Sequence, residues 1–232
     1  MILADTRGRL TGDDVELVIL VLSNGSANRR ASLERRLAAE GPDVLLDEPG
    51  LVERLLALRT LMAPSQPLLF YVLVRQALLR SGIDDRDLAD YLASMLSTFG
   101  QRDRAWRIDW NDDHQHHYLV DIVSDLEATQ GNRQFKVMAH LGNYALWVAG
   151  VFPDYITARQ RRKGGPDVSY YETWGQRGYR LAARHELADR LGLDRVFDVA
   201  ADRFSALRSA FNGLSAQLYF PGRLAPGLDP LH

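Results

Sequence analysis

An apolar segment at residues 134–152 constrains the fold of this chain more than any other feature of the sequence. Its length lies at the lower limit for a helix that crosses a membrane. Three polar residues interrupt it at helical spacing, and they favour burial in protein over burial in lipid: Lys136, His140 and Asn143. We therefore predict that the segment forms a buried core helix, and that Pro153 ends it.

Helix start and stop signals recur along the rest of the chain, whereas strand signals hardly appear. Side chains that cap helix N-termini stand before several apolar runs with a helical period. Glycine follows many of these runs, as is common at helix C-termini. The clearest signals are Thr11, Ser26 and Asp84 or Asp85 at predicted starts, and Gly41 and Gly100 at predicted ends. The predicted fold class is therefore all-α.

The length and composition of the chain are those of an ordinary globular protein. It has 232 residues, of which 46% are hydrophobic and 25% are charged, so it can bury a core without a metal ion or a disulfide. We predict a single-domain bundle of about nine or ten helices over residues 1–220, with a buried central helix. Three prolines predict a non-helical tail at residues 221–232.

The absence of cysteine excludes disulfides, thiol catalysis and cysteine-ligated zinc. The net charge of −2 argues against a general nucleic-acid-binding protein, which usually carries a positive excess. The first apolar run, at residues 15–22, follows Asp13 and Asp14 and is too short and too acidic at its start for a signal peptide. We expect a cytoplasmic protein that binds neither nucleic acid nor membranes.

Apolar residues in the predicted last helix, residues 194–219, alternate at spacings of three and four. One interpretation is that this seam packs against the preceding helix inside the bundle. The other is that it forms a self-association interface centred on Phe197, Phe204, Phe211 and Leu218. Three heptads are short for an independent coiled coil, which favours the first interpretation.

Histidine and aspartate cluster between residues 109 and 125. If a helix begins near Asp112, then His114, His117 and Asp121 share one face at i, i+3 and i+7. Imidazole and carboxylate ligands suit a divalent transition metal such as zinc, iron, nickel or manganese, which would be the cofactor. The alternative is an ordinary helix start whose acidic residues act as caps.

The polar stripe on the core helix supports a second hypothesis about function. Burying Lys136, His140 and Asn143 is costly unless each finds a partner or a ligand. The residues would form either a satisfied network, with Asp121 or Asp125 as the acidic partner, or a pocket for an anionic ligand with His140 as a proton carrier. Small residues on the same helix would let a neighbouring helix approach closely: Gly142, Ala145, Ala149 and Gly150.

A third candidate is the basic run that contains Arg161 and Arg162 and precedes a Gly-Gly-Pro turn. Clustered guanidinium groups can bind anions, although a solvated turn between helices explains the run equally well. The sequence has no catalytic signature, neither a nucleophile elbow nor a dinucleotide fingerprint. We therefore expect a non-enzymatic protein that acts by self-association or partner binding. The alternatives are a metal-dependent enzyme and a regulator that binds a small anion.

Overall fold

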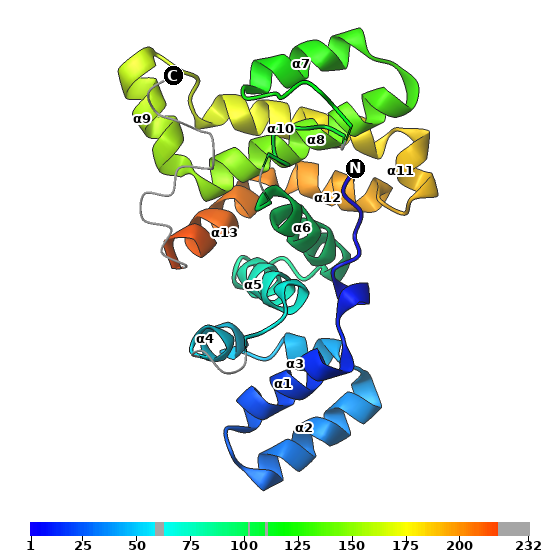
Figure 1. Cartoon of the computed structure of the whole chain (residues 1–232), viewed down its shortest axis with the longest axis vertical. Helices are drawn as coiled ribbons and strands as arrows, with labels where there is room; N and C mark the ends of the chain where they lie inside the picture. The colour runs from blue at the N-terminus through cyan, green and yellow to red at the C-terminus, as the bar shows by residue number, and fades with distance from the viewer. Residues whose placement is uncertain (59–62, 102, 110, 218–232) are drawn as a thin grey trace. The chain divides into compact units, whose positions relative to one another are not determined.

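The computed structural model describes residues 1–58, 63–101, 103–109 and 111–217, and this part of the chain is helical without any strand (Figure 1). The predicted all-α fold class is therefore confirmed. The described residues form thirteen α-helices, ten of them seven residues or longer. The predicted number was nine or ten. The difference arises because two predicted helices are each divided by a short break and because the four-residue helix Asp43–Leu46 was not predicted.

The chain divides into two compact units. The N-terminal unit spans Leu3–Ser97, and the C-terminal unit comprises Met1–Ile2 together with the residues from Thr98 onward. A single domain over residues 1–220 stays a prediction. The predicted tail at residues 221–232 lies outside the described residues.

The N-terminal unit contains a short 3-10 helix, Arg7–Arg9, and six α-helices, the last of which ends just beyond it. Predicted caps open three of them. Thr11 and Asp14 form a capping box, Ser26 accepts a hydrogen bond from the Arg29 amide, and Asp85 accepts one from Leu88. The helices are α1 (Gly12–Ser23), α2 (Ala27–Glu40), α3 (Asp43–Leu46), α4 (Leu51–Leu56), α5 (Gln66–Arg80) and α6 (Arg86–Phe99).

A buried arginine lies at the centre of the N-terminal unit. The Arg75 side chain is 1% exposed. Its Nε and Nη2 atoms donate to the Asp47 carboxylate at 2.6 and 2.9 Å, and Nη2 also donates to Asp84 at 2.5 Å. Burial alone would lower the pKa of Arg75, but these hydrogen bonds raise it overall. The arginine is therefore held in its charged form among apolar side chains.

The C-terminal unit is built around α8, as predicted, and every residue from Val137 to Gly150 is buried. Helices α7, α10 and α13 pack on it. None of the described helices, α8 included, combines the length and apolarity that a membrane span requires. The elements are α7 (Leu119–Ala128), α8 (Gly131–Val151), α9 (Pro153–Lys163), α10 (Val168–Ala183), α11 (Glu186–Arg190), α12 (Asp194–Asp202) and α13 (Phe204–Gln217).

Helices α8 and α10 approach each other closely at two glycines. A Cβ atom added to Gly178 would lie 2.7 Å from the Gly142 backbone nitrogen and 2.9 Å from the Met138 carbonyl oxygen. A Cβ atom on Gly142 would lie 2.5 Å from the Tyr179 ring. The small residues of the core helix therefore admit a neighbouring helix, and α10 is that helix.

The predicted last helix is divided at Arg203 into α12 and α13. The seam residues Phe197, Phe204 and Phe211 are 0, 0 and 1% exposed. The Phe197 ring stacks on Tyr179 at a centroid distance of 5.8 Å, and the Phe211 Cβ lies where a side chain on Gly150 would be. These three side chains therefore pack inside the unit, whereas Leu218 lies outside the described residues. Self-association through this seam stays a prediction, and the burial of these residues gives it no support.

Candidate functional site

Three of the predicted ligand-binding residues, Lys136, His140 and Asn143, line one small pocket on α8. Arg104 and Arg107 complete its polar wall from the loop between α6 and α7. We call this the His140 pocket. Its volume is about 10 Å³, which is room for about one water-sized occupant. The remaining described lining residues are mostly apolar: Met1, Ile2, Phe99, Ile108 and Ala139.

The loop that carries the two arginines is anchored by buried side chains. Trp106 and Ile108 are each 3% exposed. The Trp106 carbonyl oxygen accepts a hydrogen bond from the His116 amide at 2.7 Å. The Tyr144 hydroxyl on α8 donates to the His117 carbonyl oxygen at 2.7 Å. These contacts fix the loop against α8, so that the guanidinium groups of the loop help to line the pocket.

Positive charge predominates around the His140 pocket. Its described lining residues include three basic side chains and no carboxylate. Lys136 forms an ion pair with Asp109 just outside the lining, and not with Asp121 or Asp125, which the sequence predicts as its partner. Arg107 donates to the Asp112 carbonyl oxygen at 2.8 Å. Burial lowers the pKa of Arg104; the nearby Asp109 carboxylate opposes this shift, and the positive charge of Arg107 adds to it.

His140 is a buried polar group of this pocket whose hydrogen bonding is incomplete. The residue is 5% exposed, and its Nε2 atom has no hydrogen-bond partner among the described residues. Burial lowers the pKa of His140 to about 3, and the positive charge of Arg104 contributes to the shift. The ring is therefore neutral near pH 7. It can offer one hydrogen bond at Nε2, and the direction of this shift gives the predicted proton-carrying role near neutral pH no support.

The buried His140 predicts a pH-dependent stability. Its pKa is about 3 in the folded chain and about 6.5 in the unfolded chain, so the unfolded chain binds the proton first as the pH falls. We expect the free energy of unfolding to decrease by about 2 kcal/mol between pH 7 and pH 5 because of this residue. Urea unfolding, followed by tryptophan fluorescence at each pH, measures the effect. His140→Gln should remove this component, whereas His114→Gln, at an exposed histidine, should retain it.

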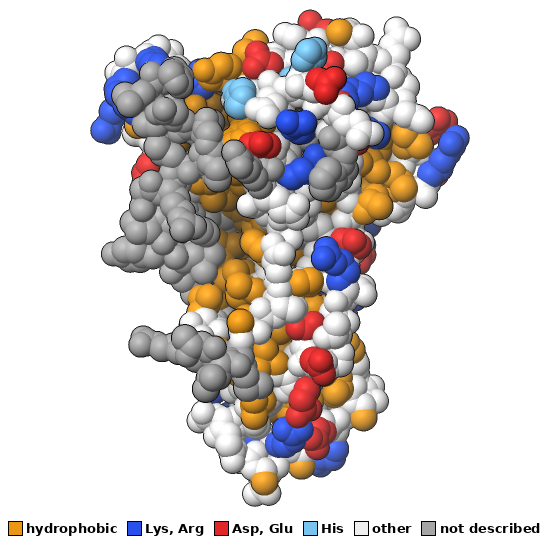
Figure 2. Space-filling model, in the orientation of Figure 1, with side chains coloured by type: hydrophobic (Ala, Val, Ile, Leu, Met, Phe, Trp, Pro, Cys, Tyr) orange, Lys and Arg blue, Asp and Glu red, His pale blue; other side chains and the backbone are white. Residues whose placement is uncertain are grey.

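The predicted metal-binding residues are not brought together. The helix expected to begin near Asp112 begins instead at Leu119, because the Asp121 carboxylate accepts a hydrogen bond from the Tyr118 amide at the N-terminus of α7. His114 and His117 therefore lie in the preceding loop, and they do not share a helical face with Asp121. Across the described ranges, no three histidine, aspartate or glutamate side chains are grouped to hold a metal ion. Figure 2 shows histidines near α7 interspersed with acidic and basic side chains.

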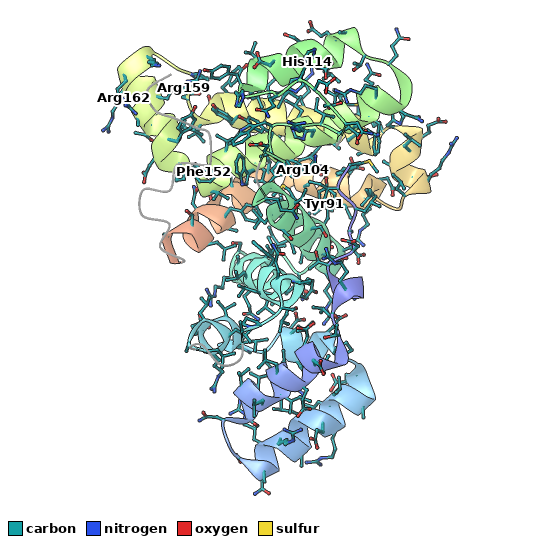
Figure 3. All side chains as sticks on the ribbon, viewed as in Figure 1. Tyr91, Arg104, His114, Phe152, Arg159 and Arg162 are labelled. Atoms are coloured by element: carbon teal, nitrogen blue, oxygen red, sulfur yellow. The ribbon has the colours of Figure 1, made fainter. Side chains whose placement is uncertain are left out.

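The remaining predicted anion-binding residues, Arg161 and Arg162, lie apart from the His140 pocket. Both are exposed in the last turn of α9, and Arg162 lies at the outer end of that helix, well away from Arg104 (Figure 3). Arg162 Nε donates to the Ala158 carbonyl oxygen at 3.4 Å. Their position fits the cationic end of a solvated helix.

A larger pocket at the starts of α7 and α10 was not predicted from the sequence. Its volume is about 370 Å³, and we call it the tyrosine pocket. The pairs Tyr170-Tyr171 and Tyr118-Leu119 are visible in the sequence, but no spacing rule connects residues 118, 159 and 170. The described lining residues are Tyr118, Leu119, Val120, Arg159, Pro166, Tyr170 and Tyr171.

Comparison with known proteins identifies no relative. No protein-family model, no curated protein and no solved structure matches this chain. The chemistry of the two pockets is therefore the basis for an argument about function.

Proposed function

We propose that this protein is a non-enzymatic binding protein that responds to a small inorganic anion, such as chloride, held in the His140 pocket. The observation that supports the proposal is the unpartnered Nε2 atom of buried His140, in a pocket lined by three basic side chains and no described carboxylate. Buried polar atoms in proteins nearly always have a hydrogen-bond partner, and an exception calls for a water or an ion.

Electrostatics favour an anion over water at this site. Arg104 is 7% exposed, and burying a cation is costly unless opposite charge accompanies it. Asp109 and Asp112 provide part of that charge. Arg133 binds Asp112 as well, at 2.8 and 2.9 Å, and also Asp125, at 3.1 Å. An anion in the pocket would place negative charge beside the three basic side chains that line it. The neutral ring of His140 would then adopt the tautomer that donates from Nε2.

The size of the pocket limits the anion. A volume of about 10 Å³ admits one water-sized particle. A halide ion is only moderately larger than a water molecule, whereas phosphate and organic acids are much larger. We therefore assign the pocket to a monatomic anion. The proposal retains the sequence-based hypothesis of a regulator that binds a small anion, and it gives no role to Arg161 or Arg162 in this pocket.

Titration with sodium chloride at constant ionic strength tests the proposal, with sodium gluconate as the balancing salt. Bound chloride should stabilise the fold by roughly 1.4 kcal/mol when its free concentration is ten times its dissociation constant. The melting temperature, measured by tryptophan fluorescence, should rise and then saturate. Lys136→Gln should weaken this response, because it removes one of the three cations from the pocket.

The chain offers a matched control, because Lys163 is the only other lysine and is exposed. Lys163→Gln should leave the chloride response unchanged. Crystals grown in bromide should show an anomalous scattering peak beside His140 Nε2. Equal stabilisation by chloride and gluconate, or a bromide-free pocket, would refute the proposal.

A further inference from the structure

The tyrosine pocket lies in the C-terminal unit, and its walls combine aromatic rings with one guanidinium group. Tyr118 and Val120 are 38% and 55% exposed, so this part of the pocket presents apolar surface to solvent. Tyr171, which also lines the pocket, is buried. The volume of about 370 Å³ falls within the range of small-molecule pockets, roughly 300–1,000 Å³. The pocket therefore has the size and the apolar surface to enclose a small organic molecule.

Arg159 is the only charged residue among the described lining residues. Its guanidinium carbon lies 4.5 Å from the centre of the Tyr118 ring, and its Nη1 atom donates to the Tyr155 hydroxyl at 3.3 Å. No described carboxylate forms an ion pair with it. The other donor atoms of the guanidinium group are therefore available to an acceptor in the pocket, and the cation favours a negatively charged one.

The tyrosine hydroxyls of the pocket add neutral hydrogen-bonding groups. Those of Tyr118, Tyr170 and Tyr171 make no hydrogen bond with any described residue. Burial raises the pKa of Tyr171 to about 12, so this phenol remains neutral and can donate at neutral pH. The Tyr170 and Tyr171 rings meet edge to face at a centroid distance of 5.9 Å. These rings form an aromatic wall, and another aromatic ring packs favourably on such a surface.

We propose that the tyrosine pocket binds a small aromatic carboxylic acid, with its carboxylate on Arg159 and its ring between Tyr118 and Tyr170. The planar guanidinium fork matches a carboxylate, which it can bind through two parallel hydrogen bonds. The apolar and aromatic walls match a flat hydrocarbon body.

Isothermal titration of the full-length protein with benzoate, 3-phenylpropionate and indole-3-acetate tests this proposal. Each acid is compared with its uncharged amide. We expect at least one acid to bind with saturation at millimolar concentration or below, and its amide to bind about tenfold more weakly. Arg159→Gln should reduce the affinity for the acid to that for the amide. Arg159→Lys should give an intermediate loss, because lysine retains the charge without the planar fork.

Arg162→Gln is the matched control on the same helix, and it should change the affinity less than about twofold, because an exposed charge outside the pocket contributes little. Circular dichroism verifies that the variants are folded. Binding that persists in Arg159→Gln, equal binding of acid and amide, or no binding by any probe would overturn the proposal. A dimer that Val120→Asp converts to a monomer would also overturn it, since it would assign this surface to a second copy of the chain.

Discussion

Replacing Asp47 with alanine is expected to lower the free energy of unfolding of the N-terminal unit by about 3–5 kcal/mol. The variant leaves the guanidinium group of Arg75 buried without the carboxylate that binds it twice. It also removes the acceptor of a 2.8 Å hydrogen bond from Arg86. Urea unfolding followed by circular dichroism measures the loss. Tryptophan fluorescence reports only on the C-terminal unit, because all four tryptophans follow residue 98.

Asp84→Ala is the matched control, because the Asp84 side chain is 79% exposed and accepts only one of the hydrogen bonds from Arg75. An exposed ion pair is worth about 1 kcal/mol or less. If Asp47→Ala lowers the free energy of unfolding no more than Asp84→Ala does, Asp47 is not the main partner of the buried Arg75 guanidinium group.

The stabilisation that the Asp47 carboxylate provides should depend on pH. Burial alone would raise the pKa of Asp47, but hydrogen bonds from Arg75 and Arg86 lower it overall. The stabilisation is therefore present above the unfolded-state pKa of about 3.9, and it is lost as the pH falls below that value.

The sequence predicted the start of a helix well where the capping side chain and the amide that it binds lie within one turn of each other. Thr11, Ser26 and Asp85 each satisfy backbone amides three residues ahead, and that interaction depends only on nearby sequence. The predicted start of α7 was wrong, because Asp112 and Asp121 are both suited to the first turn of a helix. Asp112 was predicted to cap the helix, but it accepts a hydrogen bond from the Asp109 amide in the loop and pairs with Arg133 of α8. Asp121 instead accepts the backbone hydrogen bond at the N-terminus of α7. That choice depends on tertiary contacts.

The same distinction explains how much of the candidate site was predicted. Lys136, His140 and Asn143 could be grouped because they share the period of one helix. Arg104 and Arg107 lie in an irregular loop, where no period relates them to α8. The acidic partner of Lys136 was misassigned for the same reason, since Asp109 belongs to that loop. The tyrosine pocket joins three segments that are distant in sequence, so composition alone does not indicate it.

Substituting Gly178 with alanine is expected to destabilise the C-terminal unit by about 3 kcal/mol, although alanine favours a helix over glycine by about 1 kcal/mol. The added Cβ would lie 2.7 Å from the Gly142 nitrogen and 2.9 Å from the Met138 carbonyl oxygen. Both atoms belong to the backbone of α8, so a rotamer change cannot relieve the overlap and the helices must separate. Urea unfolding followed by tryptophan fluorescence measures the loss.

Gly213→Ala provides the opposite expectation within the same unit. Gly213 lies in α13 with nothing within 4 Å of an added Cβ, so alanine should stabilise the unit by about 1 kcal/mol. Equal effects at the two glycines would contradict the close crossing of α8 and α10. The crossing also lies next to the His140 pocket, because the Tyr179 hydroxyl on α10 donates to Asn143 Oδ1 at 2.8 Å. Separating the helices should displace Asn143, so Gly178→Ala should also reduce the chloride response, whereas Gly213→Ala should preserve it.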